Sequence, residues 1–247
     1  MRPIQTYDYT VNGRDVDATL HMRLSNICDM LLETAGKDAD IMGFGSGKIA
    51  ERKLGWIISR MAVEYDSTPY LYDKLKIETW VSSNKALTNV RCFRVKDKDG
   101  KEFLRASTIW CVLDLERRRP VMLDVLGQEF MEMTADEAEP CESPKNLRPN
   151  LWSSEPLPVA FEHTVQYTDI DFNKHLNSIR YIDMMCNAMP REVMESQGRR
   201  RFVLHFCKES NFGEVIPVRH LSDGNEHYME ISRPDGSSAC LGQLTLL

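Results

Sequence analysis

Two stretches of the chain place apolar residues at the spacing of an amphipathic helix, with polar residues between them. The first set is Leu24, Ile27, Cys28, Leu31 and Ala35. Gly36 follows this set and is a suitable C-terminal cap. The second set is Ile179, Ile182, Cys186 and Met189. Pro190 prevents this helix from continuing, and Asn177 or Ser178 can cap its start.

From Lys74 to Val81, Leu75, Ile77, Thr79 and Val81 alternate with Lys74, Lys76, Glu78 and Trp80, which predicts a strand. Two longer segments predict hairpins, 91–115 around the turn Asp99-Gly100 and 228–246 around the turn Asp235-Gly236. Each helical pattern therefore precedes an antiparallel meander. The predicted fold class is α+β, with an antiparallel sheet wrapped around a buried central helix in each half of the chain.

The two halves are predicted to be copies of one unit. A shift of 154 positions places His21 on His175, and a shift of 141 positions places Tyr65 on Phe206. A segment rich in proline and acidic residues separates the copies, and we expect one short helix in it near 131–138. The predicted organisation is an N-terminal repeat at 1–126, a linker at 127–158 and a C-terminal repeat at 159–247.

The composition indicates a soluble globular protein, with 42% hydrophobic residues among 247 and a net charge of -6. This charge argues against a general nucleic-acid binder. Seven cysteines without a C-x-x-C pair favour a reduced, cytoplasmic protein, and the N-terminal residues show no secretory signal. The sequence has no apolar run of membrane-spanning length and no P-loop, dinucleotide or zinc motif. We expect no metal and no organic cofactor.

The chemistry-bearing residues are concentrated in a D-x-N-x-H-x-N run, Asp171 to Asn177. Strand-like alternation would place Asp171, Asn173, His175 and Asn177 on one side of the chain. In the first copy only the acid and the histidine recur, as Asp17 and His21, while Thr19 and Arg23 replace the two asparagines. Helix capping explains an isolated Asn177 well, but the complete polar set in one copy favours a single active site.

A second element is the end of a predicted strand at 202–206, where Glu209 and Ser210 follow. Glu209 corresponds to Thr68 of the first copy at the shift of 141. An ionisable group is therefore again present only in the second copy. Considered alone, Glu209 is explained equally well as a solvent-exposed acid without a catalytic role.

Together these segments resemble the plant and bacterial acyl-acyl carrier protein thioesterases, over almost the full length of the chain. The segments that carry the resemblance are Trp56–Met61, Ile77–Trp80, Arg105–Trp110 with Arg117-Arg118, the run from Asp171 to Asn177 with Arg180-Tyr181-Ile182, and Phe206–Ser210. The last segment keeps the glutamate of the family as Glu209, but Ser210 replaces the family's cysteine. The resemblance implies a tandem (double) hotdog fold and hydrolysis of fatty acyl thioesters on acyl carrier protein, which terminates fatty acid synthesis.

In this interpretation Glu209 activates water, with or without His175, while Asn173 orients the carbonyl or the water and Asp171 positions its neighbours. Backbone N–H groups near Asn177 would stabilise the oxyanion. A Ser210 nucleophile is the competing mechanism, and the absence of an adjacent histidine disfavours it. Ile27, Met30, Leu31 and Met42 are candidates for the acyl-chain tunnel, although core packing explains each of them as well.

The implied partner, acyl carrier protein, is acidic, so local basic patches would have to bind it. The candidates are two arginine runs, which include Arg117, Arg118, Arg199 and Arg200. An acyl-CoA thioesterase, a non-catalytic acyl-binding protein and a lyase acting on hydroxyacyl thioesters are the alternatives. Both a monomer and a homodimer are compatible with two covalently joined copies.

Overall fold

The computed structural model describes residues 3–135, 144, 147 and 155–247. The first half consists of β1 (Gln5–Thr10), a 3₁₀ turn (Gly13–Asp15), α1 (Leu24–Ile41), α2 (Ser46–Ala50), β2 (Leu54–Tyr65), β3 (Lys74–Lys85), β4 (Thr88–Lys96) and β5 (Glu102–Asp114). The second half repeats this order with β7 (Val159–Thr164), a 3₁₀ turn (Tyr167–Asp169), α4 (Ser178–Ala188), α5 (Arg191–Glu195), β8 (Arg200–Phe206), β9 (Val215–Asp223), β10 (Glu226–Ser232) and β11 (Ser238–Leu246).

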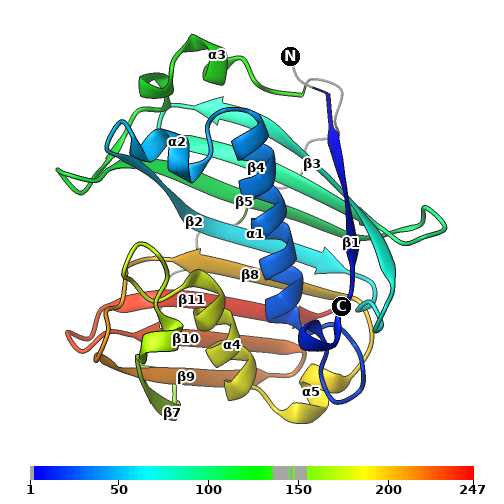
Figure 1. Cartoon of the computed structure of the whole chain (residues 1–247). Helices are drawn as coiled ribbons and strands as arrows, with labels where there is room; N and C mark the ends of the chain where they lie inside the picture. The colour runs from blue at the N-terminus through cyan, green and yellow to red at the C-terminus, as the bar shows by residue number, and fades with distance from the viewer. Residues whose placement is uncertain (1–2, 136–143, 145–146, 148–154) are drawn as a thin grey trace.

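The strands form one continuous antiparallel sheet in the order β1-β3-β4-β5-β2-β8-β11-β10-β9-β7. The two halves meet where β2 pairs with β8, and Arg60 lies opposite His205 in that register. Both central helices, α1 and α4, cover the same face of the sheet and pack against each other (Figure 1). This arrangement is the predicted tandem hotdog, an antiparallel sheet wrapped around a central helix twice over.

Equivalent backbone hydrogen bonds confirm that the halves are structural copies. The N–H of Val11 donates to the Asp73 carbonyl at 3.0 Å, and in the second half Val165 donates to Glu214 at 2.9 Å. Two further equivalent bonds run from Met22 to Pro69 at 2.8 Å and from Leu176 to Ser210 at 2.9 Å. The donors are separated by the shift of 154 and the acceptors by the shift of 141, as the sequence comparison predicts.

The helices follow the apolar pattern, with one correction at the end of α1. The prediction that α1 ends at Gly36 is wrong, because the helix continues to Ile41. The extra turn contains Asp38, whose buried carboxylate pairs with the Arg91 guanidinium of β4 at 2.6 Å and accepts a hydrogen bond from the Tyr7 hydroxyl at 2.8 Å. In α4 the Asn177 side chain accepts the Ile179 N–H at 2.8 Å, so this predicted cap is confirmed.

The segment after β5 forms the short strand β6 (Arg119–Val121), which pairs with β5, then a 3₁₀ turn (Leu123–Leu126) and α3 (Gln128–Met131). The short helix expected near 131–138 therefore lies earlier in the chain, and part of that range lies outside the described residues. Phe130 of α3 is buried against Phe44 and Trp56, which attaches this segment to the first half.

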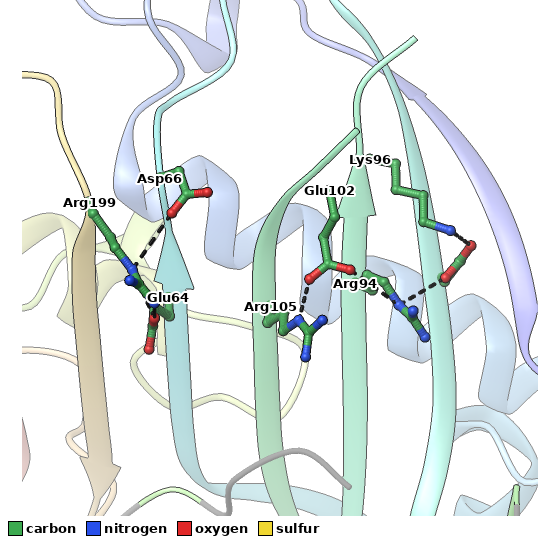
Figure 2. A network of polar contacts seen from close by, with 8 residues as sticks. Glu64, Asp66, Arg94, Lys96, Glu102, Arg105 and Arg199 are labelled. Atoms are coloured by element: carbon green, nitrogen blue, oxygen red, sulfur yellow. Dashed lines mark hydrogen bonds and ion pairs between the residues drawn. The ribbon is translucent and has the colours of Figure 1, made fainter. Parts of the chain in front are cut away.

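The face of the sheet opposite the helices carries a network of ion pairs (Figure 2). Arg94 binds Glu78 at 3.1 Å and Glu102 at 3.7 Å across neighbouring strands. Further along the sheet, Arg199 binds Glu64 and lies 3.7 Å from Asp66. The side chains project away from α1, which lies behind the strands in this view. The sheet therefore has an apolar face under the helices and a charged face on the other side.

Candidate active site

The D-x-N-x-H-x-N run forms a closed turn, not an extended strand. Asp171 donates its N–H to the His175 carbonyl at 2.9 Å, and Ile170 and Leu176 form a bridge just outside that bond. The Asp171 carboxylate accepts the N–H of Asn173 at 2.8 Å, and Lys174 adopts a left-handed conformation with φ 68°. The expected alternation along an extended chain is therefore wrong, because the aspartate folds the backbone onto its own side chain.

The first half contains the same turn. Asp17 accepts the N–H groups of Thr19 at 2.8 Å and His21 at 3.3 Å, and Leu20 is left-handed with φ 64°. Because the turn recurs without the two asparagines, the aspartate has an architectural role in both halves. The second half differs from the first at Asn173, Asn177 and Glu209, whose residue types are not needed to close this turn.

Glu209 is brought to the turn by the end of β8. The N–H of Leu176 donates to the Ser210 carbonyl at 2.9 Å, which joins the two segments. As a result, Nε2 of His175 lies 3.2 Å from Oε2 of Glu209. The Arg118 guanidinium binds the same carboxylate oxygen. The proposed acid and imidazole thus meet in space, and a cation from the first half completes the cluster.

Arg118 was expected only as part of a docking patch, and its contact with Glu209 was not predicted. It lies in the turn between β5 and β6 and adopts a left-handed conformation with φ 51°. The Asp114 carboxylate supports this turn by accepting the N–H groups of Glu116 and Arg117. Arg118 lies at a hairpin tip of the first half and Glu209 follows a strand of the second half, so no sequence pattern predicts their contact.

The two asparagines have different environments. Asn173 is exposed, lines the cavity and donates from its amide to the Asp171 carboxylate at 3.3 Å. Asn177 is occupied as the cap of α4, and its backbone N–H donates to the Asp169 carbonyl at 2.8 Å. Both asparagines line the cavity, and Asn177 in addition orients the start of α4 through its cap.

Neither Ser210 nor Cys207 has the surroundings of a nucleophile. Ser210 is 0% exposed, and its hydroxyl has no hydrogen-bond partner among the described residues. Cys207 lines the cavity, but burial and the Glu230 carboxylate raise the pKa of its thiol to about 11. Since a nucleophilic side chain needs a base or a lowered pKa, the geometry favours the glutamate–histidine pair.

A cavity of about 700 Å³ connects this cluster to the first half. Its walls include Trp56 and Ile58 of β2, Trp110 of β5 and Leu32 of α1, and it reaches the turn that contains His175. Gly36 of α1 also borders it, and a Cβ at this position would meet no atom within 4 Å. The cavity lies between the N-terminal helix and its sheet.

Only one of the four predicted tunnel residues lines this cavity. Met42 does, just after the end of α1. Ile27, Met30 and Leu31 do not, because they are buried in the central core. The cavity lies along a neighbouring stripe of α1, which the apolar pattern alone could not separate from the core stripe.

The two arginine runs lie in different places. Arg117 is exposed in the same turn as Arg118, close to Glu209. Arg199 pairs with Glu64 and Asp66 on the charged outer face (Figure 2), next to the opposite end of β8 from the cavity. Arg200 is 3% exposed and donates to the carbonyl of Val193 at 2.7 Å. The prediction that Arg200 contributes to a docking surface is therefore wrong, and Arg199 is remote from the site.

Among the described residues, no cluster of three or more His, Cys, Asp or Glu side chains is arranged to hold a metal ion. Within the same residues, no helix combines the length and the apolar character needed to cross a membrane. Among the described cysteines, Cys28, Cys111, Cys186, Cys207 and Cys240 have free thiols. Cys92 of β4 is disulfide-bonded, so the expectation of a fully reduced set is wrong for this residue.

Comparison with known proteins identifies the family. The model of the acyl-ACP thioesterase N-terminal domain matches residues 4–130, and that of the C-terminal domain matches residues 158–240. Among solved structures, an acyl-ACP thioesterase from Bacteroides thetaiotaomicron is 30% identical, with a TM-score of 0.85 over 98% of this chain and 97% of that one. The 12:0-ACP thioesterase from Umbellularia californica shares the fold, with 18% identity and a TM-score of 0.81 over 98% of this chain and 96% of that one.

A palmitoyl-acyl carrier protein thioesterase from Gossypium hirsutum is 25% identical over 88% of this chain. The match covers 55% of that protein, so the chain spans about half the length of this plant relative. The two domain models match most of the chain and follow the two halves of the structure, and the contacts of Glu209 with His175 and Arg118 lie where the halves meet. The chain therefore belongs to the acyl-ACP thioesterase family.

Proposed function

We propose that this protein hydrolyses fatty acyl-acyl carrier protein thioesters and releases the free fatty acid. The observation that carries the proposal is the contact between Glu209 and His175 on the wall of a 700 Å³ cavity with aromatic and aliphatic side chains. An apolar cavity accommodates an alkyl chain, and an acid–imidazole pair at its edge supplies a proton acceptor for water. Family membership supports the same reaction.

In this mechanism Glu209 accepts a proton from water while the water oxygen attacks the thioester carbonyl carbon. The tetrahedral intermediate then collapses, the carbon–sulfur bond breaks, and the departing thiolate takes up the proton. His175 orients the carboxylate and the water through its 3.2 Å contact with Glu209. Arg118 balances the negative charge that Glu209 carries before the attack and again after the proton has left. A base in such a position contributes roughly 10²–10⁴-fold to the rate.

The oxyanion of the intermediate needs hydrogen-bond donors, and the start of α4 offers one. The Asn177 carboxamide accepts the N–H of Ile179, while Ser178, the first residue of α4, lines the cavity. First-turn N–H groups carry the positive end of the helix dipole. We therefore assign the Ser178 N–H to the oxyanion and the Asn173 amide to the orientation of the carbonyl. One donor of this kind is worth about 3 kcal/mol.

Acyl carrier protein would bind next to the cavity entrance that Glu209 and Arg118 border. Arg117 supports this site, because its side chain is 78% exposed in the turn beside Arg118. A rim arginine of this kind accelerates encounter with an acidic partner, and added salt weakens the effect. A cytoplasmic location and the choice between monomer and homodimer stay predictions.

The test is a thiol-release assay with saturated and unsaturated acyl groups on acyl carrier protein, and with the same acyl groups on coenzyme A. We expect release from the carrier-protein substrates, and His175→Ala should reduce it strongly. His21→Ala is the matched control, since His21 occupies the equivalent turn of the first half and does not line the cavity. Faster release from coenzyme A would favour an acyl-CoA thioesterase. Binding without thiol release would contradict hydrolysis and favour an acyl-binding protein or a lyase.

A further inference from the structure

Ser210 is the point where three parts of the active site meet. Its carbonyl accepts the N–H of Leu176, which belongs to the turn of His175, at 2.9 Å. Its own N–H donates to the hydroxyl of Tyr181 on α4 at 3.0 Å. The residue before it is Glu209. The peptide group between Glu209 and Ser210 is thus fixed by a phenol, and the next one is fixed by the His175 turn.

The first half makes only one of these two connections. The Pro69 carbonyl, equivalent to that of Ser210, accepts the N–H of Met22 at 2.8 Å. Proline has no N–H, so nothing at this position requires a partner like Tyr181. The residue equivalent to Tyr181 is Ile27, a core residue that is 0% exposed. The phenol and the N–H that it binds are therefore present together in the catalytic half and absent together in the other half.

Tyr181 is held rigidly enough to define a position. It is 4% exposed, and its ring packs edge-on against Phe206 at the end of β8, with 6.2 Å between ring centroids. Burial raises the pKa of the phenol well above its usual range, so the hydroxyl stays neutral at physiological pH. A neutral hydroxyl accepts the Ser210 N–H without adding a charge near Glu209.

We propose that Tyr181 is a positioning residue for the reaction, which holds the Ser210 amide and thereby keeps the Glu209 carboxylate against His175. The inference rests on the proposed function, since it assigns a role to Tyr181 through the base of that reaction. Without the phenol, the Ser210 N–H is buried and unpaired, and the 209–210 segment gains freedom to turn toward another acceptor. A displacement of about 1 Å at a catalytic group lowers a rate about 100-fold.

The experiment is a double-mutant cycle between Tyr181→Phe and Glu209→Gln, with kcat and KM measured by thiol release from acyl carrier protein substrate. Tyr181→Phe alone should lower kcat by about 10- to 100-fold and change KM little. In the Glu209→Gln background the same substitution should cause no further loss, because the group it positions is already absent. Tyr65→Phe is the matched control, as Tyr65 is a buried core tyrosine that does not line the cavity.

Four outcomes of these measurements would contradict the positioning role of Tyr181 or the proposed function. Full activity of Tyr181→Phe, or losses that multiply in the double variant, would overturn the positioning role, since damage to folding acts equally in both backgrounds. A similar loss of kcat in Tyr65→Phe would overturn it as well. If the wild-type protein releases no thiol, the proposed function fails; if it does and the cycle is additive, only the role of Tyr181 fails.

Discussion

Nε2 of His175 lies 3.2 Å from Oε2 of Glu209, although one residue precedes α4 and the other follows β8. The contact exists because the N–H of Leu176 donates to the Ser210 carbonyl, which joins the two segments by their backbones. The first half has the same backbone bond between Met22 and Pro69, with His21 and Thr68 at the corresponding positions. A duplicated scaffold thus holds an ionisable pair in one copy only.

The first prediction concerns the identity of the base. Glu209→Gln removes the proton acceptor while keeping the shape of the side chain, so kcat should fall by roughly 10²–10⁴-fold. Steady-state thiol release measures this change. Ser210→Ala should retain activity, because its hydroxyl is buried and makes no hydrogen bond to a described residue. Loss of activity in Ser210→Ala together with an active Glu209→Gln would show that the assignment is wrong.

The second prediction separates architecture from catalysis at the two equivalent aspartates. Asp171→Ala and Asp17→Ala each remove a carboxylate that closes the same turn, so both should destabilise the protein by about 0.5–2 kcal/mol, as for a lost cap. Only Asp171→Ala should also lower kcat, because its turn presents His175 and Asn173. Chemical denaturation and kinetics on the same samples compare the two effects, and an equal loss of kcat in both variants would contradict this assignment.

The third prediction concerns the buried ion pair of Asp38 and Arg91. Their side chains are 0% and 5% exposed, and their charged groups are 2.6 Å apart. Asp38→Ala leaves a buried guanidinium without this partner, which should cost about 3–5 kcal/mol of unfolding free energy. Adding Arg91→Met should recover much of that loss, since it removes the uncompensated charge. A double variant less stable than Asp38→Ala would argue against this explanation.

The fourth prediction concerns carrier-protein docking. Arg117→Glu should raise KM for acyl carrier protein substrate and reduce the salt dependence of kcat/KM, because it reverses an exposed charge near the cavity. Arg199→Glu is the control, since Arg199 lies on the outer face next to the far end of β8 (Figure 2). That end is about 20 Å away along the strand. Equal effects of the two reversals would indicate docking elsewhere.

The fifth prediction is a pH dependence of stability. His220 and His227 are stacked, with Nε2 and Nδ1 3.1 Å apart, and burial lowers the pKa of both imidazoles in the folded protein. A lowered folded pKa stabilises the fold above the unfolded value of about 6.5, and that stability is lost as the pH falls. The Tm should therefore drop between about pH 7.5 and about pH 5.5, and by less in His220→Gln. An identical drop in the variant would exclude the pair as its source.

The amino-acid pattern was enough to predict the repeat, the two central helices and the hairpins, because these depend on local periodicity and turn residues. It also indicates the second half as the candidate catalytic half, since Asn173 and Glu209 lack counterparts of their type in the first copy. The shifts of 154 and 141 aligned residues whose backbones make equivalent hydrogen bonds. Helices and hairpins can be predicted from sequence because each depends on residues that are close together in the chain.

The contacts between side chains of distant segments are visible only in the folded protein. The Arg118 contact with Glu209 joins a hairpin tip of one half to a strand end of the other, and no local pattern encodes it. Ile27 and Leu31 were candidates for the tunnel but pack in the core, because two adjacent stripes of one helix look equally apolar in sequence. The helix α1 continues past Gly36, and the added turn is held by the ion pair of Asp38 with Arg91 on β4. Contacts between distant segments depend on the packing of the whole sheet, which residue spacing does not specify.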